Sequence, residues 1–82
     1  MKHEFTKYTY LVHGFEIGNQ NSTFENCYIS DKEMSEKEIL IEISAEYIEK
    51  GYIPTNVTLD YTENIVMDLF TKEITVSDRQ YK

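Results

Sequence analysis

The sequence contains very little of several residue types, and each shortage argues against a class of function. Arg79 is the only arginine, and eight Lys and Arg residues stand against fifteen Asp and Glu residues. The resulting net charge of −7 argues against direct binding of nucleic acid or of an anionic membrane, because both require positive side chains. Cys27 is the only cysteine, so no internal disulfide can form, and we expect a reducing, cytoplasmic compartment.

Long apolar runs and flexible linkers are also missing. No stretch is long enough to span a bilayer, and the N-terminus lacks the basic and apolar regions of a signal peptide. No repeat, low-complexity tract or glycine-rich phosphate loop is present. The apolar content of 40% is well above that of disordered chains, so the sequence predicts one soluble domain over residues 1–82.

Residues that could support catalysis or metal binding are few. His3, His13 and Cys27 are the only soft metal ligands, and none lies in the close pairs that zinc sites use. Cys27 and His13 could form a nucleophile and base only if a hairpin joined them, and no third orienting group can be identified. We therefore expect no metal, no cofactor and no enzymatic activity.

Alternating apolar residues indicate several strands. Residues 4–17 and 23–30 read as two strands, joined by a five-residue loop over the turn-forming residues 18–22. In the second strand, Phe24 and Tyr28 share one face, and Cys27 and Ile29 share the other. A third strand follows Pro54, residues 62–64 read as a turn, and residues 65–70 form either a further strand or a short helix. Residues 77–82 are polar, and we expect them to fray.

One helix has clear start and stop signals. Ser35 and Glu38 form a capping box, and Met34 with Ile39 supplies a hydrophobic staple. Gly51 can adopt the left-handed conformation that ends a helix. The sequence thus predicts a helix over about residues 36–50. The whole chain reads as an α+β domain of order β-β-α-β-β, with the helix laid across one face of an antiparallel sheet.

The predicted helix carries two unusual surfaces. A row of carboxylates occupies one sector and leaves like charges four residues apart, which is unfavourable in an isolated helix. A second row, beside the apolar residues that face the sheet, is also apolar and packs either under a loop or the C-terminal segment, or forms an interface. The acidic row consists of Glu38, Glu42, Glu46 and Glu49, and the apolar row of Ile41, Ala45 and Ile48.

These surfaces favour a binding protein over an enzyme. The acidic row suits a basic partner, most naturally a protein, and a regular row of carboxylates can imitate phosphates in the way of small phage-type inhibitors that occupy a basic groove. The simpler alternative is that the acidic row is a solvated face that only keeps the protein soluble. The apolar row suits a self-associating structural or accessory protein instead, with a homodimer formed through the helix.

Overall fold

The computed structural model describes residues 1–81, with Ser77 described by its backbone only. Four strands and one helix follow one another along the chain. They are β1 (Lys2–Glu16), β2 (Asn19–Ser30), α1 (Glu36–Glu49), β3 (Tyr52–Asp68) and β4 (Ile74–Tyr81).

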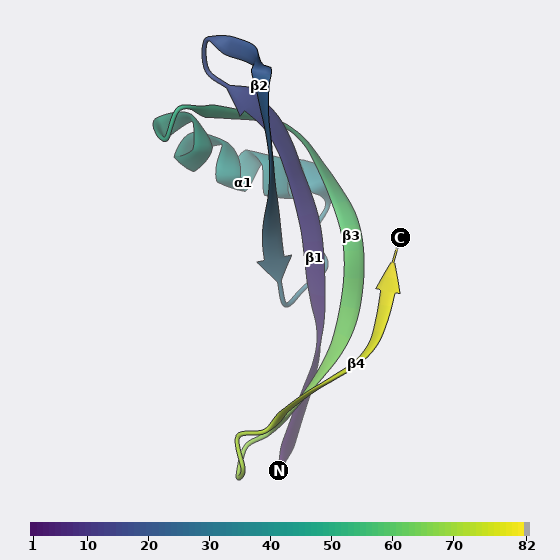
Figure 1. Ribbon diagram of the computed structural model, residues 1–82. Coiled ribbons are helices and arrows are strands. Elements are labelled where there is room, and N and C mark those ends of the chain that lie inside the picture. Colours follow the sequence, from purple (N-terminus) through teal and green to yellow (C-terminus); the bar gives the residue numbers. More distant parts are fainter. Residues whose placement is uncertain (82) are drawn as a thin grey trace.

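A single antiparallel sheet of order β2-β1-β3-β4 makes up most of the protein. The two long central strands pair along their whole length, from Lys2 opposite Asp68 to Glu16 opposite Tyr52. The edge strand β2 lies along the second half of β1, and β4 lies along the second half of β3. The molecule is therefore elongated, with extents of 51 × 24 × 20 Å, and the sheet curls along its length (Figure 1).

The α+β class predicted from the sequence is wrong. Strands take up 64% of the chain and the helix 18%, so the protein is mostly antiparallel sheet, curled like part of a barrel. The order of the elements and the antiparallel pairing are as predicted. Helix α1, however, is confined to one end of the sheet, near the β1–β2 hairpin, and leaves the end with the N-terminus bare (Figure 1). The reason is that β1 and β3 continue far beyond the length that one 14-residue helix can cover.

The predicted turn at residues 62–64 is also wrong, as is the alternative of a short helix at 65–70. Strand β3 runs through residues 62–68 without a break in pairing to β1, and Leu69 and Phe70 lie in the turn that follows it. Two polar side chains of this segment have partners in the sheet: Glu63 binds Lys7 and Arg79, and Asn64 Oδ1 accepts a hydrogen bond of 3.3 Å from Thr6. These long-range partners outweigh the local preference of the residues for a turn.

Two boundaries predicted from the sequence are displaced. The β1–β2 hairpin has a two-residue connection at Ile17 and Gly18, with Gly18 at a φ of 83°, instead of a five-residue loop. The segment expected to fray is part of β4 as far as Tyr81, while Lys82 lies outside the described residues. A left-handed glycine lets the chain reverse in two residues, so pairing begins at once.

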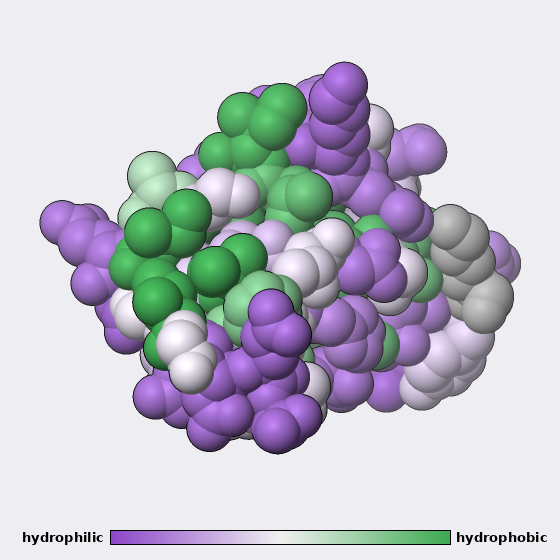
Figure 2. Space-filling view, turned by 90° about the horizontal axis from the view of Figure 1, so that it is seen from above, coloured by the Kyte–Doolittle hydropathy of each residue, from purple (hydrophilic) through white to green (hydrophobic). Residues whose placement is uncertain are grey.

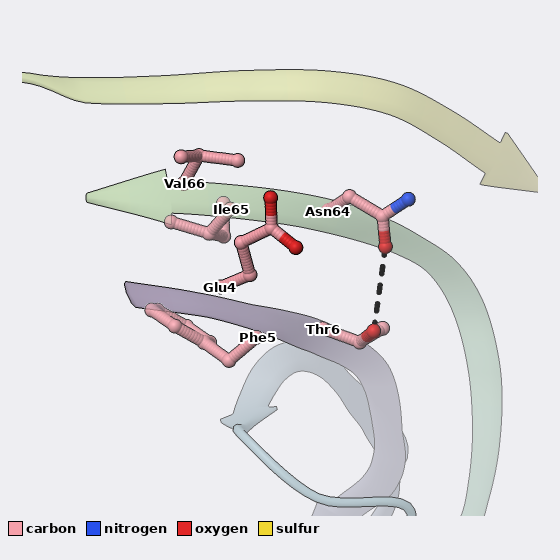
Figure 3. A pocket seen from close by; sticks show the side chains of 6 residues that line it. All are labelled: Glu4, Phe5, Thr6, Asn64, Ile65 and Val66. Atoms are coloured by element: carbon pink, nitrogen blue, oxygen red, sulfur yellow. Dashed lines mark hydrogen bonds between the residues drawn. The ribbon is translucent and has the colours of Figure 1, made fainter. Parts of the chain in front are cut away.

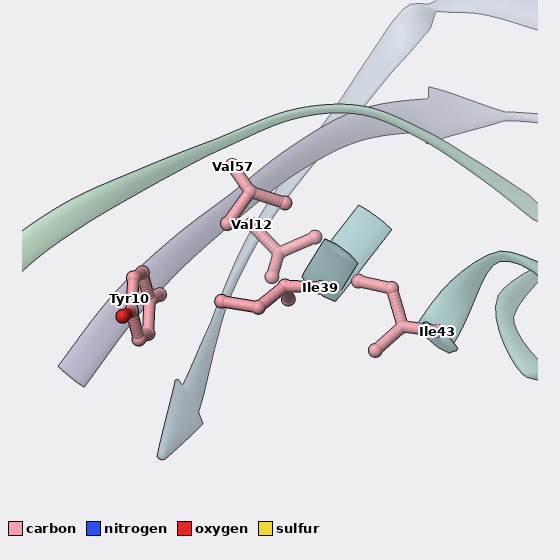
Figure 4. Packing of buried hydrophobic residues seen from close by; sticks show 5 residues of the cluster. All are labelled: Tyr10, Val12, Ile39, Ile43 and Val57. Atoms are coloured by element: carbon pink, nitrogen blue, oxygen red, sulfur yellow. The ribbon is translucent and has the colours of Figure 1, made fainter. Parts of the chain in front are cut away.

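The core lies where α1 meets the sheet. Ile39 and Ile43 of α1 are buried against three residues of the central strands, Tyr10, Val12 and Val57 (Figure 4). Burying these side chains holds the helix to one end of the sheet through the hydrophobic effect. Within residues 1–81, no helix has the length and apolar character needed to cross a membrane.

Candidate functional site

Local sequence signals position helix α1 as predicted. Ser35 is the N-cap, and its Oγ accepts a hydrogen bond of 3.1 Å from the backbone N–H of Glu38. Met34 packs against the core that contains Ile39, as the staple requires. Gly51 follows the helix with a φ of 96°, the left-handed conformation expected at this point. Because both ends are fixed, the direction of every helical side chain is fixed as well.

The four carboxylates of the acidic row are all exposed on α1. Three of them have polar neighbours: Glu38 accepts from the Ser35 hydroxyl at 3.1 Å, Glu42 from the Tyr28 hydroxyl at 3.1 Å, and Glu46 pairs with Lys50 at 3.1 Å. Burial, and then the hydrogen bond to Glu42, raises the pKa of Tyr28 above its usual value. All these contacts are exposed and leave the carboxylates accessible to a partner.

The apolar row of α1 is exposed as well, so it does not pack under a loop or under the C-terminal segment. Ile41 is 68% exposed and Ile48 is 51% exposed, and Ala45 between them is also exposed. The core of the protein uses the opposite side of the helix, where Ile39 and Ile43 lie. An exposed row of this kind on a helix is typical of a contact surface.

The two rows together form one surface, which we call the outward face of α1: Ile41, Ala45 and Ile48 beside Glu38, Glu42, Glu46 and Glu49. At 100° per residue, the apolar row lies opposite the buried pair Ile39 and Ile43, whereas the acidic row lies on the flank beside that pair, on the side of β2. In the view down the long axis, apolar side chains interrupt a largely hydrophilic surface (Figure 2). The outward face thus combines an apolar strip with carboxylates on one flank.

A groove adjoins this face between α1 and β2. Its aromatic lining consists of Phe24, Tyr28, Tyr47 and Tyr52. The ring centroid of Phe24 lies 5.5 Å from that of Tyr47 and 5.4 Å from that of Tyr52. Glu46 and Lys50 also line the groove. Aromatic and charged side chains in this proximity can hold a protein side chain.

A second charged cluster lies at the middle of the sheet, where sequence reasoning placed a turn. Glu63 is only 4% exposed and binds Arg79 at 3.0 Å and Lys7 at 3.4 Å. The guanidinium lies 4.4 Å from the ring centroid of Tyr61 and donates to the Tyr81 hydroxyl at 3.2 Å. The hydrogen bond from Arg79 lowers the pKa of Glu63, and the contacts with Tyr81 and Glu63 raise the pKa of Arg79. The cluster links β1, β3 and β4, and we interpret its role as structural.

The residues considered for metal binding or catalysis lie on β1 and β2, where the hairpin places Cys27 opposite Leu11 and His13 opposite Glu25. His13 Nδ1 lies 3.6 Å from a Glu25 carboxylate oxygen, His3 lies 5.8 Å from the Phe5 ring, and Cys27 is exposed on β2. The described residues contain no group of three or more His, Cys, Asp or Glu side chains that could hold a metal ion. The predicted faces of β2 are confirmed, since Tyr28 pairs with Tyr10 on the helix side and Cys27 pairs with Leu11 on the other.

Comparison with other proteins adds no functional assignment. The chain matches no protein family, no curated protein and no solved structure. Function must therefore be argued from the surfaces of this chain alone.

Proposed function

We propose that this is a non-enzymatic, cytoplasmic protein-binding domain that uses the outward face of α1 to hold a basic surface of another protein. The observation that supports the proposal is the exposed apolar strip formed by Ile41 and Ile48 beside a row of carboxylates. Neither row alone would be sufficient support for the proposal. Exposed carboxylates are common on acidic proteins, and single exposed apolar residues need no explanation.

The combination matches the chemistry of protein interfaces. Apolar residues at the centre of an interface exclude water and supply most of the affinity, whereas charged residues at the rim set the association rate and the choice of partner. On α1, the apolar strip would supply the centre and the acidic row one rim. A rim of carboxylates requires lysine or arginine on the partner.

The partner should therefore carry both basic and apolar side chains. A groove that holds only nucleic-acid phosphates would match the carboxylates but leave the apolar strip without a counterpart. An inhibitor that occupies a basic groove remains a narrower form of the same proposal, provided that apolar residues line part of that groove. A homodimer through this face is disfavoured, because it would bring two acidic rows together at a cost.

The proposal can be tested with synthetic helical peptides of defined pattern. One peptide carries leucines on one face and lysines on the other, a second replaces the lysines with glutamates, and a third replaces the leucines with alanines. Only the first should bind with measurable affinity by isothermal titration calorimetry. Its binding should weaken as salt increases, because exposed charges are screened over about 8–10 Å at moderate ionic strength.

Two double variants separate the contributions of the rows. Glu42→Lys with Glu49→Lys should slow association with the lysine–leucine peptide, and Ile41→Ala with Ile48→Ala should speed dissociation. Glu4→Lys with Glu73→Lys makes the same change in net charge far from the helix and should leave binding nearly unchanged. Equal binding of the lysine and glutamate peptides, or equal effects of both charge-reversal pairs, would refute the proposal.

A further inference from the structure

Among residues 1–81, no other element covers the end of the sheet remote from α1 (Figure 1). It consists of residues 2–7 of β1, residues 63–68 of β3 and strand β4, and we call it the sheet end. The helix lies at the opposite end of the molecule (Figure 1). A sheet normally buries at least one face against another layer, so a bare sheet of three strands is incomplete by itself.

One face of the sheet end is apolar. Register places Phe5, Ile65 and Val76 in one row across the three strands, with His3, Met67 and Ile74 in the next row on the same face. Phe5 and Ile65 point to one side of the sheet, and Glu4 and Val66 point to the other (Figure 3). Val76 is 52% exposed and Ile74 is 60% exposed, whereas Ile65 is only 6% exposed and Phe5 and Met67 are half-buried, so the face is open to solvent mainly at β4.

Further apolar residues lie at the tip of the sheet end. Phe70, in the turn between β3 and β4, is 81% exposed, and Leu69 beside it is exposed as well. The backbone N–H of Leu69 donates to the carbonyl oxygen of Met1 at 2.8 Å, which places the exposed Met1 side chain in the same region. The tip therefore extends the apolar face.

The size of the exposed surface matches one side of a dimer. The chain has an accessible surface of 5954 Å², whereas a compact monomer of this mass exposes about 5100 Å². Its radius of gyration is 15.7 Å, against about 12 Å for a compact domain of this length. The excess of about 800 Å² follows from the elongated shape of the chain and is large enough to supply the share that each partner buries in an interface of standard size.

The distribution of charge favours a second copy at this end. Residues 8–62 carry ten acids and three bases, whereas residues 1–7 and 63–81 carry five acids and four bases. The part of the chain that bears the helix therefore has a net charge of −7, whereas residues 1–7 and 63–81 have a net charge of only −1. Two copies can approach through the sheet end without the like-charge repulsion that opposes contact through α1.

The edge of the sheet is less suitable for pairing than its face. Strand β4 shifts register opposite Thr62 and Asn64, and Asp78 has a φ of 50°, so its outer edge is irregular. Irregular edges hinder the addition of a further strand. The apolar rows, in contrast, lie on a regularly paired stretch from Ile74 to Val76.

We propose that two copies of this chain associate by packing the apolar faces of their sheet ends against each other. The contact buries Phe5, Met67, Ile74 and Val76 from each copy, in the manner of two sheets stacked about 10 Å apart. In a dimer with two-fold symmetry, the same apolar patch of each copy is buried against that of the other. Both helices stay outside the contact, so the dimer can form whether or not α1 binds a partner.

Sedimentation equilibrium over a concentration series tests this proposal. The wild-type chain should be dimeric at about 100 µM, since interfaces of this area give micromolar or tighter affinity. The dimer should persist in about 1 M salt, because its contact is apolar. Ile74→Lys with Val76→Lys should raise the dimer dissociation constant at least about tenfold, since the burial of lysine without a partner is unfavourable.

Two further variants make the outcome decisive. Ile74→Thr with Val76→Thr keeps the β-branched shape that suits a strand and should also weaken the dimer, with secondary structure checked by circular dichroism. Ile41→Lys with Ile48→Lys changes equally exposed residues on α1 and should leave the dimer intact. A monomeric wild type at about 100 µM would overturn the proposal. So would a dimer that only the helix variants dissociate.

Discussion

The Tyr10 hydroxyl makes two hydrogen bonds with the backbone of Met34. It donates to the Met34 carbonyl oxygen at 2.9 Å and accepts from the Met34 N–H at 3.0 Å. Tyr10 is a buried residue of the central strand β1, and Met34 lies just before the N-cap of α1. This pair of bonds therefore ties the start of the helix to the middle of the sheet, 24 residues away in the chain.

Removal of this hydroxyl should destabilise the protein. Tyr10→Phe keeps the buried ring but leaves both backbone groups of Met34 without their partner, at an expected cost of about 1–3 kcal/mol. The measurement is the free energy of unfolding from a urea titration. Tyr8→Phe is the control, since the Tyr8 hydroxyl has no hydrogen-bond partner among the described residues and its ring also packs near the core. Equal losses in the two variants would contradict the anchoring role of Tyr10.

Loss of the helix cap should have a smaller effect. Ser35→Ala removes the acceptor for the Glu38 N–H and should cost about 1 kcal/mol. Ser35→Asp restores an acceptor at the same position and should recover most of the loss. Helicity and the urea midpoint report both effects. An alanine variant with the stability of the wild type would show that the cap contributes nothing.

Gly14 should tolerate no side chain. A Cβ at this position would collide with the carbonyl oxygen of Ile53 and lie 2.6 Å from the Phe24 ring. The register of β1 and β3 also shifts between His13 and Gly14, and glycine is common at such irregularities. Gly14→Ala should therefore cost about 1–3 kcal/mol through overpacking.

Gly18→Ala provides the comparison for Gly14. No heavy atom lies within 4 Å of a Cβ added at Gly18, so only its positive φ opposes the change, at about 1 kcal/mol. Thermal denaturation should rank the Gly14 variant as the less stable of the two. The reverse order would show that the Phe24 ring and the Ile53 carbonyl pack less tightly around Gly14 than the structure indicates.

Stability should fall in acid because of Glu63. The hydrogen bond from Arg79 is the main cause that lowers the pKa of Glu63 in the folded protein, with a smaller contribution from Lys7. A carboxyl with a lowered folded pKa stabilises the protein above its unfolded pKa of about 4.3. This stabilisation is lost as the pH falls from about 5 through the folded pKa.

Glu63→Gln should remove that dependence. The variant should be less stable than the wild type at neutral pH, and its urea midpoint should change less between about pH 5 and pH 2. Glu73→Gln, which alters an exposed side chain in the turn before β4, should follow the wild-type curve. Parallel curves for the wild type and Glu63→Gln would mean that the cluster has no role in acid stability.

Features that depend on neighbours in the chain could be predicted from the sequence. The cap joins residues three positions apart, and the left-handed end of the helix depends on Gly51 alone. The alternation of β2 also follows from the backbone, so Phe24 and Tyr28 share a face as expected. The acidic row of α1 could be located for the same reason, because helical spacing fixes which residues lie together.

The fold class, and whether the apolar row of α1 is exposed or covered, depended on contacts between residues far apart in the sequence. Local patterns do not reveal such contacts. Residues 62–64 have the composition of a turn, yet they continue a strand. The reason is that Glu63 forms ion pairs with Lys7, 56 positions away, and with Arg79. The exposure of Ile41 and Ile48 could not be decided from periodicity, which shows that a row exists but not what covers it. Only the path of the chain in space decides which charges meet and which apolar residues remain in water, because both depend on residues far apart in the sequence.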